Sequence, residues 1–169
     1  PTRVDLAGGT LDMWPLYNFV GQAVTVNVAI DVFTRVVLTP RADSKIILES
    51  LDLKLKKEYQ NLKDALSDSD QRMHLLKKQL EFWRPSGGFE LVTSSQSPVG
   101  GGLGGSSSLT ISLLKAFSQF VRRPFESVHQ MVHVAHNIEA DILGTPTGTQ
   151  DYYPAASGGM NILRYSQWG

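Results

Sequence analysis

The N-terminal third of the chain carries the alternation of apolar and polar residues that is typical of strands. Between positions 23 and 30, three valines alternate with Thr25 and Asn27, which predicts a strand with the valines on one face. Residues 10–18 are polar and aromatic, and Pro15 argues against a helix there. Further β-branched runs predict strands at 32–38 and 44–49, and residues 3–7 suit a short strand as well.

The pattern changes to a helical one between positions 53 and 83. This stretch is rich in Lys, Leu, Gln and Glu and contains neither Gly nor Pro, so it predicts two helices. The break falls at 67–70, where serines and aspartates can cap the second helix. Its lysines are typical of a solvated face. The apolar stripe comprises Leu62, Leu66, Met73, Leu76 and Leu80.

The C-terminal half mixes both kinds of element. We expect a strand at 89–92, helices at 106–120 and 125–143, a short helical piece at 151–156 and a strand at 160–163. Strands therefore come first and helices are added later. That order favours an α+β fold over regular βαβ alternation.

Composition narrows the functional classes. The chain has 169 residues, 16 basic and 16 acidic side chains and no cysteine. One domain, 1–169, suits this length. Zero net charge argues against nucleic acid as a partner, and the missing cysteines exclude disulfides, thiolate metal sites and cysteine nucleophiles. No apolar run approaches the roughly 18 residues of a membrane span, so we expect a soluble, cytoplasmic protein without membrane contact. Because the chain opens on Pro1 without Met, we also expect a processed or incomplete N-terminus.

Glycine is the residue whose distribution is unusual. Seven of the 15 glycines fall between Gly87 and Gly105, and most belong to a loop at 98–105 between a predicted strand and a predicted helix. Glycines let the backbone turn tightly and approach a ligand closely. The free N–H groups at the start of the following helix attract anions, so the loop predicts a phosphate cradle.

Three other interpretations of this loop are weaker. A Walker A loop needs Lys where Ser106 stands. The dinucleotide pattern Gly-x-Gly-x-x-Gly is matched, but the acidic residue beyond it, Glu126, follows Arg-Arg-Pro-Phe without a second strand. A flexible linker is disfavoured because well-patterned elements flank the loop closely.

The loop resembles the phosphate loop of the GHMP kinases, a family that includes galactokinase, homoserine kinase, mevalonate kinase and phosphomevalonate kinase. Residues 1–12 resemble that family's first motif, and their Ala-Gly-Gly-Thr-x-Asp form is similar to the heptose-phosphate kinase and fucokinase branches. Galactokinases carry Glu–His where Gly9 and Thr10 stand, which disfavours galactose. Glu139, followed by 144–151 and two glycines at 158–159, resembles the third region.

This resemblance implies the α+β N-terminal domain of a GHMP kinase, similar to domain 2 of ribosomal protein S5, with a mixed sheet packed against helices. Family members add a C-terminal domain, so the chain is expected to lack about half of an enzyme. The implied activity is transfer of the γ-phosphoryl group of ATP to a hydroxyl of a monosaccharide or sugar phosphate, with ATP and Mg²⁺ as cofactors and a homodimer as one possible assembly.

The same resemblance implies a role for each matching residue. Asp151 corresponds to the catalytic aspartate, and Arg3 to the arginine that stabilises it and the phosphates. Ser106 and Glu139 correspond to the Mg²⁺ ligands. Asp12 and Gly148 belong to the substrate side. The implied nucleotide-binding residues are Pro98, Gly100, Gly101, Gly102, Leu103, Gly104, Gly105, Ser106, Ser107 and Ser108.

Structural roles compete with these assignments. Asp151 could cap the helical piece after it, Arg3 could form a strand-surface pair with Asp5, and Glu139 could be a solvated helix residue. His129, His133 and His136 share a helical stripe that could bind a metal, although an exposed stripe is the better interpretation. Two further functions stay open: a GHMP kinase for a non-sugar alcohol such as mevalonate, and a catalytically silent nucleotide- or sugar-binding regulator.

Overall fold

The structure is a computed structural model that describes residues 1–98 and 100–166. Its strands are β1 (Thr2–Ala7), β2 (Ala23–Ile30), β3 (Thr34–Pro40), β4 (Ile46–Ser50), β5 (Leu55–Tyr59), β6 (Phe89–Ser95) and β7 (Met160–Tyr165). Its helices are α1 (Leu16–Val20), α2 (Leu62–Ser67), α3 (His74–Trp83), α4 (Gly105–Phe120), α5 (Val128–Leu143) and α6 (Tyr152–Ser157), with 3₁₀ turns η1 (Gly9–Asp12) and η2 (Gln71–Met73). This is the α+β fold expected from the element order.

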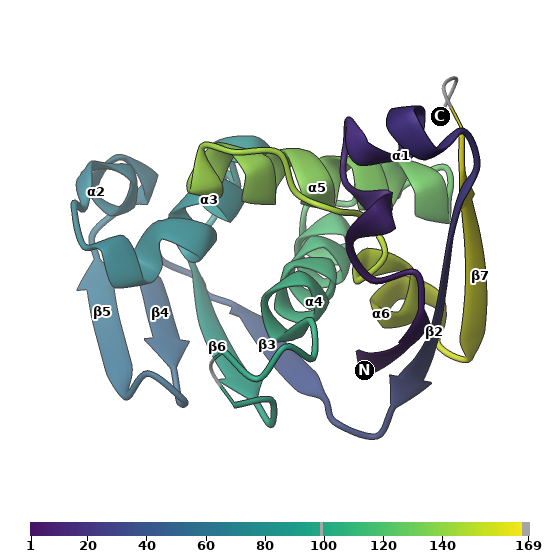
Figure 1. Cartoon of the computed structure of the whole chain (residues 1–169). Coiled ribbons are helices and arrows are strands. Elements are labelled where there is room, and N and C mark those ends of the chain that lie inside the picture. Colours follow the sequence, from purple (N-terminus) through teal and green to yellow (C-terminus); the bar gives the residue numbers. More distant parts are fainter. Residues whose placement is uncertain (99, 167–169) are drawn as a thin grey trace.

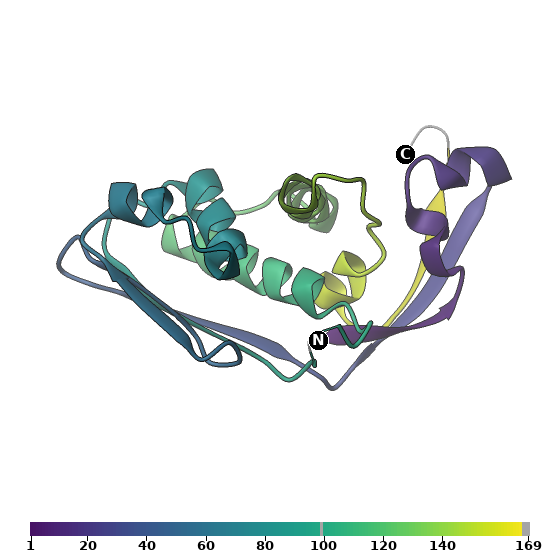
Figure 2. The ribbon, with the colours of Figure 1, turned by 60° about the vertical axis from the view of Figure 1, so that its left-hand side comes forward.

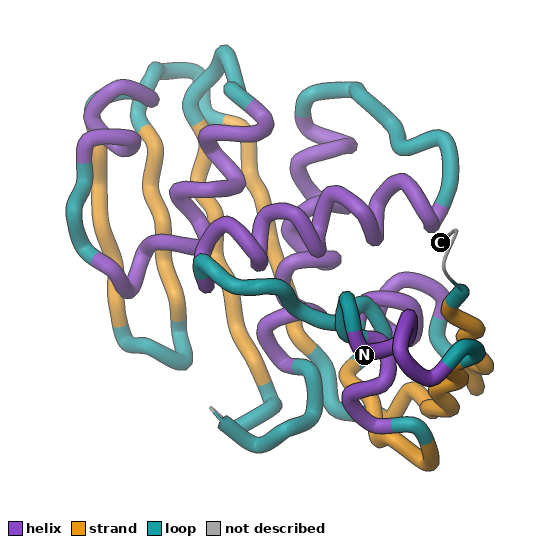
Figure 3. Tube along the Cα trace, turned by 45° about the horizontal axis from the view of Figure 1, so that its top comes forward, coloured by secondary structure: helices purple, strands orange, loops and turns teal. Residues whose placement is uncertain are grey.

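The strands form two sheets. The larger has the order β3-β6-β4-β5 and is mixed, because β4 and β6 run parallel while the other pairs are antiparallel. The smaller, β1-β2-β7, is entirely antiparallel. The chain passes from one sheet to the other where β2 leads into β3 (Figure 1). Helices α3, α4 and α5 all lie on the same side of the larger sheet (Figures 2 and 3).

The hydrophobic core lies between the larger sheet and these helices. Helix α4 packs on β3 and also contacts α3, α5 and α6, so it buries residues around most of its circumference. Leu113, Leu114 and Phe117 are completely buried, and the Phe117 ring meets Phe89 edge-on and stacks on Trp83. Packing on several sides fixes α4 firmly, and with it the glycine loop that precedes it.

The smaller sheet reverses the usual burial pattern. The valines of β2 share one face as predicted, yet the residues between them are the fully buried ones: Thr25 and Asn27 have no exposed surface. On the opposite, outer face, Leu6 and Ile162 are more than half exposed. The polar face is directed inward, toward the segment around Gln150, because Asn27 Nδ2 donates to the Gln150 carbonyl (3.1 Å). The alternation of apolar and polar residues predicted strand β2 correctly but did not show which of its faces is buried.

Two predicted elements were wrong. Residues 55–59 form β5 instead of part of a helix, since Lys56 and Lys57 alternate across the strand and pair with carboxylates on either side (Lys56 with Glu49, Lys57 with Asp68). Pro15 does not prevent a helix, because it occupies the N-cap position of α1. The first error arises because pairing with β4 outweighs the local propensity of residues 55–59, and the second because a proline is tolerated at the start of a helix.

Val99, inside the predicted phosphate loop, lies outside the described residues. Within residues 1–98 and 100–166, none of the helices has both the length and the apolar character needed to cross a bilayer.

Candidate active site

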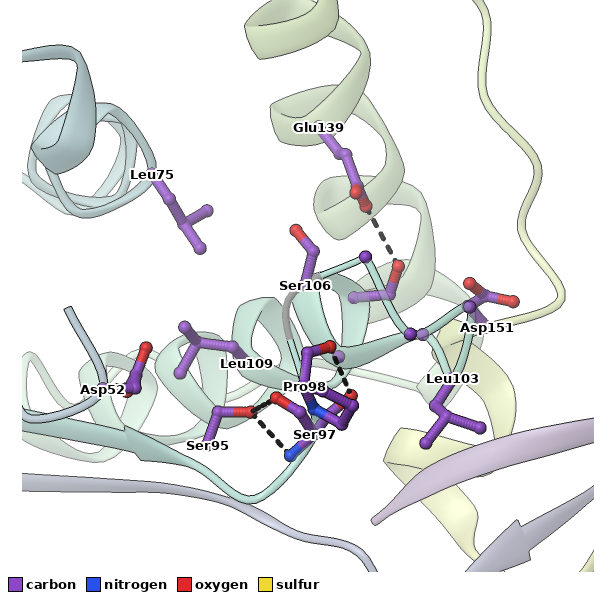
Figure 4. A pocket seen from close by; sticks show the side chains of 16 residues that line it. Asp52, Leu75, Ser95, Ser97, Pro98, Leu103, Ser106, Leu109, Glu139 and Asp151 are labelled. Carbon is purple, nitrogen blue, oxygen red and sulfur yellow. Dashed lines mark hydrogen bonds between the residues drawn. The ribbon is translucent and has the colours of Figure 1, made fainter.

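The glycine loop connects β6 to α4 and borders a cavity of about 380 Å³ (Figure 4). Gly100, Gly102 and Gly104 have φ between +68° and +73°, a backbone region that only glycine adopts without strain. Glu139 from α5 and Asp151 from the start of α6 line the same cavity. Three segments that are distant in sequence therefore meet around one space.

The first turn of α4 presents free amides to this cavity. Its N-cap is Gly104, whose lack of a side chain leaves no side-chain cap, and the first intrahelical bond runs from the Ser108 amide to the Gly104 carbonyl (2.9 Å). The amides of residues 105–107 precede that bond and have no partner within the helix. Such amides, together with the helix dipole, attract an anion, which makes this helix start a candidate anion-binding site.

The three consecutive serines have different environments. Ser106 is exposed at the cavity, whereas Ser107 donates to Glu139 Oε2 (3.1 Å) and is buried. The Ser108 hydroxyl donates to the Pro1 carbonyl (2.8 Å), lies 2.9 Å from Thr34 Oγ1, and is almost fully buried. Only Ser106 therefore offers its hydroxyl to a ligand, while Ser108 fixes α4 to the N-terminal strands.

Arg3 joins the glycine loop to Asp151. Its Nε donates to Asp151 Oδ1 (2.8 Å), and its Nη1 donates to the Gly102 carbonyl. Its backbone amide donates to the Leu103 carbonyl (3.1 Å), and the guanidinium also pairs with Asp5 (3.0 Å). Arg3 is only 8% exposed, which excludes an ordinary surface pair with Asp5. One residue of β1 thus contacts both the glycine loop and Asp151.

The Asp151 side chain does not cap the helix that it precedes. It points toward Arg3 and the glycine loop, and a Cβ on Gly104 would lie 3.1 Å from Asp151 Oδ2, so a side chain at 104 would crowd the carboxylate. Burial raises the pKa of Asp151 to about 6, and Arg3 opposes the shift only in part. A carboxyl group with such a pKa is a candidate general base.

Asp12 supports the segment that leads to Asp151. It is 5% exposed, and its Oδ2 accepts a hydrogen bond from the Gln150 amide (2.9 Å). Burial raises the pKa of Asp12 as well. A Cβ on Gly148 would lie only 2.0 Å from the same oxygen, so glycine is required there. The two residues predicted for the substrate side are therefore in direct contact.

No sequence motif marks several residues that contribute to the site. Gln150 is held from both sides, since Asn27 donates to its carbonyl and its own Nε2 donates to the Gly9 carbonyl (2.6 Å). Tyr152 is fully buried and donates to Glu139 Oε2. Burial and the nearby carboxylate of Glu139 raise the pKa of Tyr152 far above its ordinary value, so the hydroxyl stays protonated. The end of the cavity opposite Asp151 is lined by Asp52, Leu75, Ser95 and Leu109 (Figure 4).

The histidine stripe on α5 does not form a metal site. His129 Nδ1 lies 2.8 Å from the Tyr153 hydroxyl and His136 Nε2 lies 3.0 Å from the Thr147 carbonyl, so two of the imidazoles have separate partners. Across the described part of the chain, no three His, Cys, Asp or Glu side chains are grouped closely enough to hold a metal ion. His129 and His133 are exposed, as expected for a helix surface, and His136 is half-buried.

The sequence of this chain also matches a known protein family. The GHMP kinases N terminal domain matches residues 70–159, which is more than half of the chain. The chain belongs to the GHMP kinases. The matched span contains the glycine loop, Glu139 and Asp151, and so includes all three segments that meet at the cavity of this GHMP kinase domain.

Individual relatives agree with the family assignment. The D-glycero-alpha-D-manno-heptose 7-phosphate kinase of Campylobacter jejuni is 33% identical over 98% of this chain and 49% of its own length. A crystal structure of a D-glycero-D-manno-heptose 1-phosphate kinase from Bacteriodes thetaiotaomicron superposes with a TM-score of 0.88 at 27% identity, covering 99% of this chain and 55% of that one. The Methanococcus jannaschii mevalonate kinase shares the fold, with a TM-score of 0.76 at 22% identity over 100% and 54% of the two chains. This GHMP kinase domain spans about half the length of these relatives.

Proposed function

We propose that this domain belongs to an ATP-dependent sugar kinase that transfers the γ-phosphoryl group to a hydroxyl of a monosaccharide or sugar phosphate. The observation that carries the proposal is the position of Arg3, which bonds both the backbone of the phosphate loop and the carboxylate of Asp151. Phosphoryl transfer requires the donor phosphate and the acceptor hydroxyl to be held side by side. One buried arginine linking the two halves of the site supplies such a constraint.

The nucleotide would lie along the cavity. Its phosphates would accept hydrogen bonds from the loop amides and from the free amides at the start of α4, next to Asp151. The base and ribose would extend toward the opposite end, where Leu75 and Leu109 offer apolar surface and Asp52 and Ser95 offer polar groups. Ser108 would contribute through the packing of α4, since its hydroxyl and its amide are both already bonded.

Ser106 and Glu139 are the groups that fit a divalent cation. Both line the cavity beside the phosphate-binding amides, and both offer hard oxygen atoms (Figure 4). Mg²⁺ typically takes few protein ligands and completes its shell with phosphate oxygens and water, which suits a site with one hydroxyl and one carboxylate. When bound, the cation would neutralise charge on the phosphates and orient them.

Asp151 is the proposed base. With a pKa of about 6, its carboxyl is ionised at neutral pH and can accept the proton of the acceptor hydroxyl. The oxygen of that hydroxyl forms its bond to the γ-phosphorus while the bond to the bridging oxygen breaks and ADP leaves. The charged guanidinium of Arg3 keeps the carboxylate oriented through the hydrogen bond to Oδ1.

The acceptor would bind on the far side of Asp151, next to Asp12 and Gly148. The Asp12 carboxylate is 5% exposed and accepts backbone hydrogen bonds from Gln150 and Thr149, so it would act mainly by holding the 148–151 segment beside the acceptor. We favour a heptose-type sugar phosphate as the acceptor, because the Campylobacter jejuni and Bacteriodes thetaiotaomicron relatives bear names of that class. The second half of those relatives would complete the acceptor site in a longer chain.

The decisive experiment compares Asp151→Asn with wild type in the full-length natural protein. We expect turnover to be lost while ATP affinity, measured by calorimetry, is kept. Asp64→Asn, on the exposed surface of α2, is the matched control and should leave turnover unchanged. Retained turnover in Asp151→Asn would remove this residue from the mechanism. An ADP-release assay over heptose-, mannose-, fucose- and galactose-type substrates identifies the acceptor.

A further inference from the structure

The carboxylate of Glu139 is held on one side by two hydroxyl groups. Tyr152 of α6 and Ser107 of α4 both donate to the same oxygen, Oε2, the latter at 3.1 Å. Glu139 itself lies on α5, so three different helices meet at this carboxylate. Because both donors converge on Oε2, the other oxygen, Oε1, is left for a ligand from the cavity.

Both donors are buried. The Tyr152 side chain is completely enclosed, and Ser107 is 5% exposed. A buried hydroxyl without a partner is destabilising, so these two groups need an acceptor inside the fold, and Glu139 supplies it. Glutamate has three side-chain torsions and adopts many rotamers when solvated. Two buried donors on one oxygen select a single orientation of Glu139 before any ligand arrives.

Tyr152 also links Glu139 to Asp151 along the chain. Asp151 and Tyr152 are consecutive at the start of α6, and their side chains point to different partners. Asp151 bonds Arg3, whereas Tyr152 bonds Glu139. A displacement of α6 would therefore move the proposed base and the proposed metal carboxylate together. Neighbouring Tyr153 has a different environment, since its hydroxyl lies 2.8 Å from His129 Nδ1.

We propose that Tyr152, assisted by Ser107, is a positioning residue that orients Glu139 so that Oε1 can bind the divalent cation of the nucleotide complex. This inference rests on the proposed function, because it takes Glu139 as a cation ligand. Groups that hydrogen-bond a metal-binding carboxylate orient it, and their loss typically lowers metal affinity about 10- to 100-fold.

The test measures what the cation adds to nucleotide binding. Calorimetry gives the affinity of the full-length protein for ADP with excess EDTA and again with saturating Mg²⁺, and the ratio is the magnesium enhancement. In Tyr152→Phe we expect the EDTA value to be unchanged and the enhancement to fall about tenfold. Mn²⁺ affinity of the ADP complex, followed by electron paramagnetic resonance, should fall by a similar factor. Tyr153→Phe is the matched control and should leave both values unchanged.

Glu139→Gln separates failure of this inference from failure of the proposed function. If Glu139→Gln loses the enhancement while Tyr152→Phe keeps it, the positioning role is overturned and the cation site stands. If Glu139→Gln also keeps the enhancement, Glu139 is not a cation ligand and both proposals for it are wrong. Thermal unfolding checks that each variant is folded. Should Tyr152→Phe not fold, Ser107→Ala provides the second test: a reduced enhancement supports the inference, and an unchanged one overturns it.

Discussion

The titration of Asp151 makes the stability of the domain depend on pH in an unusual direction. Its side chain is 25% exposed, and burial raises its pKa from 3.8 to about 6. Aspartates in ion pairs normally show the opposite shift. Replacing Asp151 with Asn keeps the size and the hydrogen-bond acceptor for Arg3 but removes the ionisation. The comparison therefore isolates the effect of the charge.

The size of the change in unfolding free energy follows from the pKa shift of Asp151. The difference between 3.8 and about 6 is roughly 2 pKa units, and each unit corresponds to about 1.36 kcal/mol, so the effect is about 3 kcal/mol. Between these two pKa values the folded state holds the proton and the unfolded state has lost it. The free energy of unfolding of wild type should therefore decrease by about 3 kcal/mol as the pH rises from about 4 to about 6.5, and stay level above that.

Urea unfolding at a series of pH values measures this effect. The free energy of unfolding of Asp151→Asn minus that of wild type should rise by about 3 kcal/mol across the interval, whatever its absolute value. Asp141→Asn is the control with the opposite sign, since Lys78 lowers the pKa of Asp141 and its contribution is lost as the pH falls. Parallel curves for wild type and Asp151→Asn would show that the pKa is not raised and would refute the argument.

Two other substitutions test the geometry of the site. Ser106→Ala should weaken Mg²⁺-ATP binding about tenfold and leave binding in EDTA unchanged; equal calorimetric affinities for Mg²⁺-ATP in variant and wild type would contradict its role as a cation ligand. Gly148→Ala would bring a Cβ to 2.0 Å from Asp12 Oδ2 and should lower the free energy of unfolding by about 1–3 kcal/mol in urea titrations. Gly87→Ala, whose Cβ would meet nothing within 4 Å, is its control, and similar losses in both variants would argue against the close contact.

Local pattern identified most elements but failed where pairing partners decide the conformation. The strand at 23–30 and the helix ending at Phe120 have the residues expected from their periodicity. The composition of residues 55–59 favours a helix, but the neighbouring strand β4 pairs with them and makes them a strand. A run of five residues contains too few turns for the two periods to be distinguished.

In the site, too, some features follow from the local sequence and others depend on distant partners. The three serines after Gly105 are identical in type, yet α4 directs one to the cavity, one to Glu139 and one to the N-terminus. Successive residues on a helix point about 100° apart, so their separation follows once the helix is placed, but the partners come from distant segments. Tyr152 is fully buried, and its bond to Glu139 could not be predicted from the sequence because the two residues lie on different helices.

The sequence by itself determined the α+β class, the glycine loop with its anion-binding chemistry, and the motifs that place the chain in its family. These features depend on backbone freedom and on short-range periodicity, which neighbouring residues specify. Only the tertiary structure decided that Asp151 pairs with Arg3 instead of capping α6, that the polar face of β2 is the buried one, and that Asp12 holds the segment before Asp151. Each of these depends on contacts across more than a hundred residues, and burial and hydrogen bonding at that range arise only when the chain is folded.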